Sequence, residues 1–143
     1  LYSTSVWDLT SAREIVALGP SMIKIPSATN QNFALQGFLC ERFGGEIHVS
    51  TGMSTAEEVE RVVAFHEERG RAGDLVLYAC TSGYPVAFED VCLFEVARLM
   101  DRYGGRVKGI GFSGHHLGIA ADVAALAIGR IKEAEGRGRF THV

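Results

Sequence analysis

The sequence has few cysteines, no cluster of basic residues and no long hydrophobic run, and each shortage excludes a class of protein. Its three cysteines are odd in number and form no close pair, which excludes the zinc and redox motifs that need such pairs. We interpret Cys40, Cys80 and Cys92 as reduced residues that pack as small hydrophobes. The apolar runs are too short to span a membrane, and no secretory leader pattern opens the sequence. We therefore expect a cytoplasmic protein with no membrane partner.

The charge balance argues against a nucleic-acid partner. The formal net charge is -3, and no basic stretch provides the electrostatic footprint that binding to DNA or RNA needs. With 47% hydrophobic and 22% charged residues, the 143-residue chain has the composition of a globular core. Because the first residue is Leu1 and not a methionine, we expect part of a longer protein.

Apolar segments of strand length alternate with helical segments along the chain. We expect strands centred near residues 3, 24, 48, 78 and 110, and the continuous apolar run Leu75–Cys80 is typical of a strand buried on both faces. No strand is predicted after Gly129, where the tail is polar and rich in glycine. About five βα units with parallel strands fit part of a TIM-type (β/α) barrel, and a small doubly wound α/β sheet fits the same length.

Capping signals mark the start of three predicted helices. The signals are Ser11 with Glu14, Asn32 alone, and Thr55 with Glu58, and the helices that follow them cover residues 12–18, 33–43 and 56–69. Two further helices are expected over residues 91–103 and 119–128, the second of them rich in alanine.

Polar side chains follow every predicted strand. Because parallel strands end at the same edge of a sheet, these side chains should share one rim, where hydroxyls and helix N-termini favour an anion. Each of them also suits an ordinary cap or turn. The residues are Ser3, Thr4 and Ser5; Ser27, Thr29 and Asn30; Ser50 and Thr51; Thr81, Ser82 and Tyr84; and Ser113, His115 and His116.

Two positions carry stronger chemical signals than the rest of the rim. Lys24 lies between two isoleucines of a strand, where alternation points its side chain away from them, and a buried ammonium requires an anionic partner. His115 and His116 are adjacent imidazoles between glycines, a pattern that suits a divalent metal or proton transfer. We assign structural or solvation roles to His48 in its strand and to His66 on a charged helix face.

Five short motifs occur in order along residues 1 to 129 and together resemble the sialic acid synthase family. Members condense phosphoenolpyruvate with an N-acyl mannosamine or a related sugar. The motifs are Ser3-Thr4 before Trp7-Asp8; Lys24-Ile-Pro-Ser27; Ser50-Thr-Gly-Met53; Cys80-Thr-Ser-Gly-Tyr-Pro85 with Phe88-Glu-Asp-Val91; and Gly111-Phe-Ser-Gly-His115 with Leu117-Gly-Ile119.

The resemblance implies a homodimeric enzyme with an eight-stranded β/α barrel and a small antifreeze-like domain. This chain resembles strands three to seven of the barrel, so the first two strands, the last strand and the antifreeze-like domain are expected to be absent. Carried over by position, Lys24 and His115 are catalytic, and His115 binds Mn²⁺ or Mg²⁺. Phosphoenolpyruvate and the sugar are the implied substrates, and the implied substrate-binding residues are Thr4, Lys24, Ser27, Thr29, Ser82, Tyr84 and Ser113.

The chain also departs from the family pattern. Thr29 stands where many members have a sugar-binding carboxylate, and His116 stands where threonine or glutamate is common. Arg139 stands where a second metal-binding histidine is expected, and Ala79 where histidine is frequent. Three hypotheses follow: a condensing synthase, a non-catalytic phosphate-binding or assembly module built on the same rim, and a doubly wound nucleotide-type domain. An open arc of five strands would expose its inner face and two edges, which predicts self-association.

Overall fold

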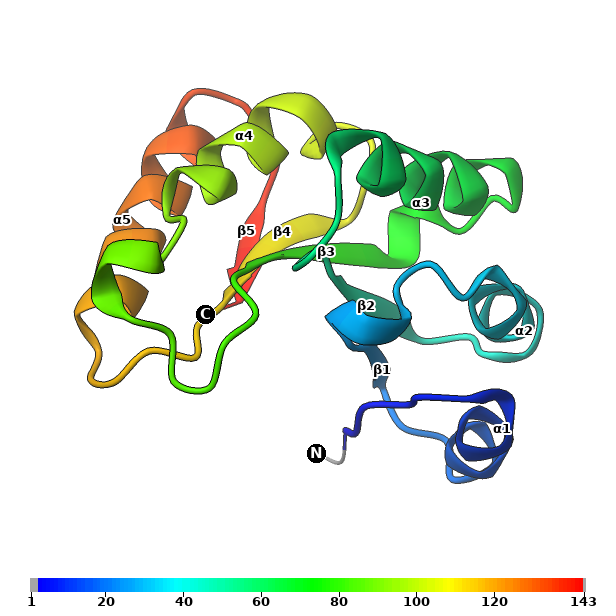
Figure 1. The fold of residues 1–143 in the computed structure, drawn as a ribbon. Helices are drawn as coiled ribbons and strands as arrows, with labels where there is room; N and C mark the ends of the chain where they lie inside the picture. Colours follow the sequence, from blue (N-terminus) through cyan, green and yellow to red (C-terminus); the bar gives the residue numbers. More distant parts are fainter. Residues whose placement is uncertain (1–2, 143) are drawn as a thin grey trace.

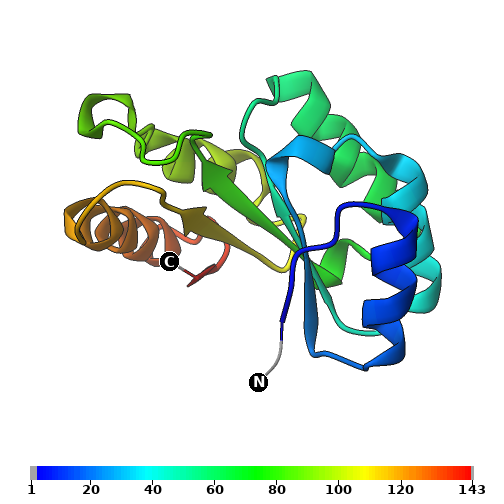
Figure 2. The same ribbon diagram turned by 60° about the horizontal axis from the view of Figure 1, so that its bottom comes forward.

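A curved parallel β-sheet with helices along one side forms the framework of the molecule (Figures 1 and 2). The computed structural model describes residues 3–142, so Leu1 and Tyr2 of the predicted first strand lie outside the described residues. The strands are β1 (Met22–Ile25), β2 (Glu46–Ser50), β3 (Leu75–Cys80), β4 (Gly109–Ser113) and β5 (Phe140–His142). They lie in the order β1-β2-β3-β4-β5, each parallel to its neighbours.

Each strand is followed or preceded by a helix on the convex side of this arc. The α-helices are α1 (Leu9–Ala17), α2 (Phe33–Arg42), α3 (Ala56–Glu68), α4 (Phe94–Tyr103) and α5 (Ala120–Ala134), and short 3-10 turns are η1 (Ser27–Thr29), η2 (Ala72–Asp74) and η3 (Phe88–Asp90). A doubly wound sheet would carry helices on both faces and a reversal of strand order. The observed arrangement is therefore the wall of a (β/α) barrel, as one of the two sequence alternatives predicts.

Alternation along each strand separates an outer face from an inner one. Outward residues such as Ile23, Val49 and Leu77 are fully buried against the helices and form the hydrophobic core. Lys24, His48 and Tyr78 alternate with them and face inward. The inner face was expected to be exposed, but His48 and Tyr78 are 1% and 8% exposed, because polar side chains on this face cover one another.

The ends of the sheet differ from the sequence prediction. Around residue 3 no full strand forms, and a single parallel bridge joins Ser5 to Lys24. The prediction of no strand after Gly129 is wrong, because Phe140–His142 pairs with β4 as β5. Gly129 makes this pairing possible, since a Cβ atom there would lie 2.2 Å from the Phe140 ring. The glycine-rich tail therefore returns to the sheet.

The predicted caps are confirmed for α2 and α3 but not for α1. Asn32 accepts a hydrogen bond from the Leu35 amide, and Thr55 forms its capping box with Glu58. In α1 the N-cap is Asp8, whose carboxylate accepts from the Ser11 amide at 2.8 Å, so Ser11 is the third helical residue and not the cap. The two residues form a reciprocal capping box, in which the Ser11 hydroxyl accepts from the Asp8 amide at 3.3 Å.

Two further expectations require correction. Helix α5 runs to Ala134 and not to residue 128, since Gly129 is accommodated within the helix and the first glycine at positive φ after it is Gly136. His66 does not lie on a charged helix face: it is fully buried, and its Nε2 lies 2.9 Å from Gln36 Oε1. Among the described residues, no helix is both long and apolar enough to cross a lipid bilayer.

Candidate functional site

A cavity of about 260 Å³ lies at the carboxyl ends of the strands, on the inner side of the sheet. Five of the predicted site residues line it, which shows that the parallel strands bring distant motifs together as expected. The described lining contains one ammonium group and no carboxylate, so its electrostatic field favours an anion. The lining residues are Ser5, Trp7, Lys24, Pro26, Ser27, Ser50, Cys80, Tyr84, Ser113 and His115.

Lys24 is the positive charge of the cavity. Its ammonium lies 3.5 Å from the centroid of the Tyr78 ring, an arrangement that attracts the cation to the face of the ring. Burial lowers the pKa of Lys24 to about 8, and the nearby Cys80 has the opposite, smaller effect. An anion placed beside this ammonium would compensate its burial, as the sequence argument for Lys24 requires.

Ser27 and Gly52 form the tightest part of the site. The Ser27 hydroxyl accepts a hydrogen bond from the Gly52 amide at 3.1 Å and lies 3.6 Å from the Cys80 sulfur. A Cβ atom on Gly52 would lie 2.7 Å from both Ser27 Oγ and Ser82 Oγ. Only a glycine at position 52, after β2, therefore lets the hydroxyls of Ser27 and Ser82, which follow β1 and β3, come this close to the backbone.

His115 is oriented by the loop that follows β3. Its Nδ1 lies 3.2 Å from the Thr81 carbonyl, which can only accept, so this nitrogen carries the proton. The lone pair of Nε2 is then available to a proton or a metal, an arrangement typical of metal-binding histidines. The Tyr84 ring lies against the imidazole with centroids 4.4 Å apart and the ring planes tilted by 41°, and Tyr84 is 82% exposed, so it forms an open wall at the mouth.

His116 points away from His115 and packs elsewhere. Its side chain is 3% exposed, contacts the Phe112 ring and lies 3.4 Å from an Asp122 oxygen. Its two ring nitrogens have no hydrogen-bond partner within the described structure. The two adjacent imidazoles therefore do not form a joint metal site.

Three predicted substrate-binding residues do not line the cavity. Thr4 precedes Ser5, and Ser5 lines the cavity in its place, since alternation turns neighbours to opposite sides. Thr29 lies in η1, with its hydroxyl 3.4 Å from the Pro26 carbonyl. Ser82 lines an adjoining cavity of about 280 Å³ that shares Cys80.

Several lining residues lie outside the catalytic and substrate-binding set that the resemblance implies, although Ser5 and Ser50 belong to the predicted polar rim. Ser5, Ser50 and Cys80 occupy inward positions near the ends of their strands. Cys80 was interpreted as a packing residue, and strict alternation counted from Lys24 through its partner strands would have placed it on the inner face. Trp7 has no such signal, because it lies in the irregular segment before α1.

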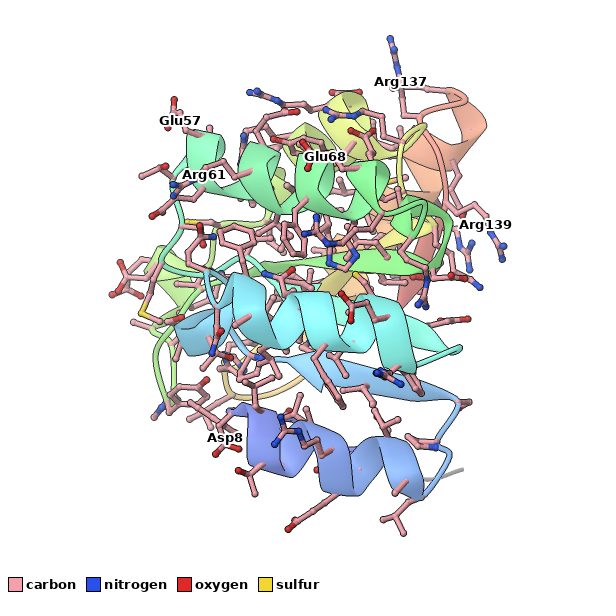
Figure 3. All side chains as sticks on the ribbon, turned by 90° about the vertical axis from the view of Figure 1, so that its right-hand side faces the viewer. Asp8, Glu57, Arg61, Glu68, Arg137 and Arg139 are labelled. Atoms are coloured by element: carbon pink, nitrogen blue, oxygen red, sulfur yellow. The ribbon has the colours of Figure 1, made fainter. Side chains whose placement is uncertain are left out.

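The described residues fit one ligand of a divalent metal and not a complete protein site. No group of three or more His, Cys, Asp or Glu side chains that could hold a metal occurs among them. Arg139 lines a separate cavity with Glu46 and Lys108, which stand where β2 and β4 begin. Figure 3 shows Arg139 at one end of the molecule and Asp8, before α1, at the other. Arg139 therefore does not approach His115.

The NeuB family matches residues 1–131. The chain belongs to the NeuB family. The resemblance drawn from five short motifs is confirmed by this match, which covers all of them.

Several curated relatives of this NeuB chain are named as synthases of N-acetylneuraminate 9-phosphate, pseudaminic acid or N,N'-diacetyllegionaminic acid. N-acetylneuraminate-9-phosphate synthase of Drosophila melanogaster is 34% identical over 128 residues, which is 90% of this chain and 33% of the relative. Pseudaminic acid synthase of Campylobacter jejuni is 37% identical over 81 residues, covering 57% of this chain and 22% of the relative. The chain thus spans about a third of the length of the first relative.

A solved structure supports the barrel interpretation of the fold. The sialic acid synthetase of Leptospira borgpetersenii superposes with a TM-score of 0.79 at 24% identity, over 96% of this chain and 44% of that chain. At this identity the likeness establishes the fold. The parallel arc of the NeuB chain therefore has the same fold as 44% of that solved chain.

Proposed function

We propose that this chain carries the phosphoenolpyruvate-binding part of a nonulosonate synthase active site. The observation that supports the proposal is the cavity in which Lys24 is the cation and Ser27 and Ser113 supply hydroxyls, with no carboxylate in its described lining. The co-substrate is an N-acyl mannosamine or a related sugar, with or without a 6-phosphate. The relatives named for sialic and pseudaminic acids support this substrate class.

Each residue of the cavity has a distinct task in the proposed binding mode. The Lys24 ammonium neutralises the phosphate or carboxylate of phosphoenolpyruvate, and the hydroxyls of Ser27 and Ser113 donate hydrogen bonds to its oxygens. Tyr84, exposed at the mouth, offers an apolar face to the sugar. Thr4, Thr29 and Ser82 stand outside the cavity and belong to the proposal only if the bound sugar extends beyond it.

The proposed reaction joins the two substrates and releases phosphate. The enol carbon of phosphoenolpyruvate attacks the aldehyde carbon of the open-chain sugar, so a carbon–carbon bond forms and the aldehyde oxygen takes up a proton. Water then adds to the phosphate-bearing carbon, and the carbon–oxygen bond to phosphate breaks. His115 lines the cavity, and because its Nδ1 proton is held by the Thr81 carbonyl, the Nε2 lone pair is left for a divalent metal.

A divalent metal such as Mn²⁺ or Mg²⁺ is part of the proposal. His115 Nε2 is the one described ligand, and a bound metal would polarise the sugar aldehyde as a Lewis acid. The remaining ligands would be substrate oxygens, water or residues beyond those described.

Calorimetry and a phosphate-release assay test the proposal on the chain itself. We expect phosphoenolpyruvate to bind at pH 7, and the Lys24→Met variant, which removes the charge but keeps the length, to lose most of the affinity. The matched control is Lys132→Met, because Lys132 lies on α5, where it pairs with Asp101 and Glu135. Equal binding by wild type and Lys24→Met would reject the proposed anion site.

A turnover assay separates the two hypotheses that fit the observed fold, a condensing synthase and a non-catalytic phosphate-binding module. Phosphate release with N-acetylmannosamine or its 6-phosphate in the presence of Mn²⁺ would support a synthase. Binding of phosphoenolpyruvate without release would favour the non-catalytic anion-binding module, which the same cavity also permits.

A further inference from the structure

A continuous series of polar contacts runs along the inner face of the sheet from the candidate site to the opposite end. The Lys24 ammonium lies over the Tyr78 ring, and the Tyr78 hydroxyl is 2.9 Å from His48 Nδ1. His48 Nε2 is 3.0 Å from Glu46 Oε2, and Glu46 Oε1 is 2.9 Å from the Lys108 ammonium. We call these five residues the inner chain.

The hydrogen-bond directions in the inner chain follow from the chemistry of its members. With neutral His48, the Glu46 carboxylate can only accept, so His48 Nε2 carries the proton and Nδ1 presents a lone pair. The Tyr78 hydroxyl therefore donates to Nδ1. Donation of this proton increases the electron density of the phenol ring, which strengthens the attraction between the ring face and the Lys24 ammonium.

The inner chain is buried where it contacts the ring. His48 is 1% exposed and Tyr78 is 8% exposed, so neither ring can change orientation without breaking buried contacts. In the strand register Lys24 is the direct partner of His48, and Tyr78 is the partner of Ser50, one inward position further along. The Tyr78 ring therefore reaches back along the sheet to cover Lys24.

We propose that Tyr78 is a positioning residue, which holds the Lys24 ammonium in the anion site while His48, Glu46 and Lys108 fix the orientation of the ring. The proposal rests on the proposed function of Lys24 as the cation of that site. It assigns a task to residues that none of the five family motifs identifies. Tyr78 itself does not contact the substrate in this scheme.

The proposal makes the protonation of Lys24 depend on the ring. The titratable groups that face Lys24 are His48 from β2, Tyr78 and Cys80 from β3, and His115 from the loop after β4. Burial lowers the pKa of Lys24 to about 8, whereas the ring favours the charged form. An anion that needs the ammonium is therefore bound below pH 8 and lost above it, and loss of the ring moves this limit to lower pH.

Competitive acylation measures this dependence without any ligand. The chain has three lysines, Lys24, Lys108 and Lys132, so mass spectrometry can follow the pH dependence of acetic anhydride labelling at each. For Tyr78→Phe, which keeps the ring but removes its hydrogen bond to His48, we expect a small fall of the Lys24 midpoint, by about 0.3 pH units. For Tyr78→Leu, which keeps the site apolar, we expect it to fall by about half a unit or more.

Fluorination of the ring provides a second test that leaves the shape almost unchanged. Replacing Tyr78 by 3,5-difluorophenylalanine withdraws electron density from the ring face, and we expect about threefold weaker phosphoenolpyruvate binding than Tyr78→Phe at pH 7.5. This comparison remains valid if Tyr78→Leu fails to fold. The Lys132 labelling profile is the internal control, because Lys132 lies on α5 and has no contact with Tyr78.

The outcomes separate the positioning role from the proposed function. The positioning role would be overturned if neither the Lys24 midpoint nor the anion affinity changes among the Phe, difluorophenylalanine and Leu variants of Tyr78. This holds even if the variants are less stable. A midpoint that shifts in a chain that does not bind phosphoenolpyruvate would support the positioning of Lys24 and reject the proposed function.

Discussion

At the scale of single residues, the candidate site depends on close approach more than on the number of polar groups. Gly52 lets two hydroxyls and a carbonyl meet at one point, since its missing side chain would lie 3.2 Å from the Cys80 carbonyl as well. Serines at strand ends are common, so the sequence alone could not separate Ser27 from ordinary caps. Ser27 differs from an ordinary cap because its hydroxyl meets that of Ser82 beside Gly52.

Gly52→Ala should destabilise the chain and weaken anion binding together. The added methyl group would collide with Ser27 and Ser82, and we expect a loss of about 1–3 kcal/mol in the free energy of unfolding, measured in urea. Gly105→Ala is the control, because a Cβ atom there has no neighbour within 4 Å. Equal stability of the two variants would show that the hydroxyls can move apart.

Cys80 should report occupancy of the site. It lines the same cavity as Lys24, whereas Cys92 is exposed and lies outside that cavity. We expect phosphoenolpyruvate to slow alkylation of Cys80 by iodoacetamide and to leave the rate at Cys92 unchanged, as followed by peptide mass spectrometry. Equal protection at both cysteines, or at neither, would contradict this placement of the ligand.

At the scale of elements, β5 shows where sequence reasoning reaches its limit. The strand is only three residues long and follows Gly136 and Gly138, both at positive φ, so neither length nor composition signals it. Tertiary packing decides its formation, because the Phe140 ring occupies the space over Gly129 of α5. The strands near residues 24, 48, 78 and 110 were predictable, since each is a longer apolar or alternating run.

Gly129→Ala should release β5 from the sheet. A Cβ atom would lie within 2.6 Å of three Phe140 ring atoms, so the ring or the helix must move. We expect faster hydrogen exchange at the Phe140 amide, which donates to Glu133, and at the Ile110 amide, which donates to the Arg139 carbonyl. Unchanged exchange in β2 is the internal control, and unchanged exchange at Phe140 would contradict the prediction.

The contact between α2 and α3 should make stability depend on pH. His66 is fully buried against Gln36, and burial together with the charge of Arg71 lowers its pKa to about 4. The unfolded chain, with an ordinary histidine pKa near 6.5, then binds more protons than the folded chain between pH 6.5 and 4. This contribution to stability is complete above pH 6.5 and is lost as the pH falls toward 4.

Urea unfolding at pH 7 and pH 4.5 measures this contribution. Wild type should lose roughly 2 kcal/mol more than His66→Gln between the two pH values, because glutamine removes the titration but remains polar. Carboxylates that also titrate in acid cancel in the difference between the two proteins. An equal loss in both would show that His66 is protonated without cost in the folded state.

At the scale of the whole molecule, the fold was largely predictable and the site only in part. Repetition of βα units specifies a parallel sheet, and the motif order brings Lys24, Ser27, Tyr84, Ser113 and His115 into one cavity. The orientation of the His116 side chain could not be predicted from the sequence, since it depends on packing against Phe112 and Asp122. The inner chain could not be predicted from the sequence either, because its contacts join side chains of three different strands.

The exposed apolar side chains predict self-association. Ile119, Val123 and Leu126 lie on one side of α5 and its N-cap and are 74%, 60% and 41% exposed. Size-exclusion chromatography with light scattering should show a dimer or larger species, and Val123→Lys with Leu126→Lys should shift it toward the monomer. A monomeric wild-type chain at high concentration would contradict the prediction.

The strand order has a consequence for how such a chain can grow and fold. Because every strand pairs with the strands that precede and follow it in sequence, no strand has to insert between two that are already paired. Each pairing closes the loop of one βα unit only, so the sheet can assemble stepwise, one unit at a time. Units can therefore be added or lost at either edge during evolution without rewiring the pairs that remain, much as in a repeat protein.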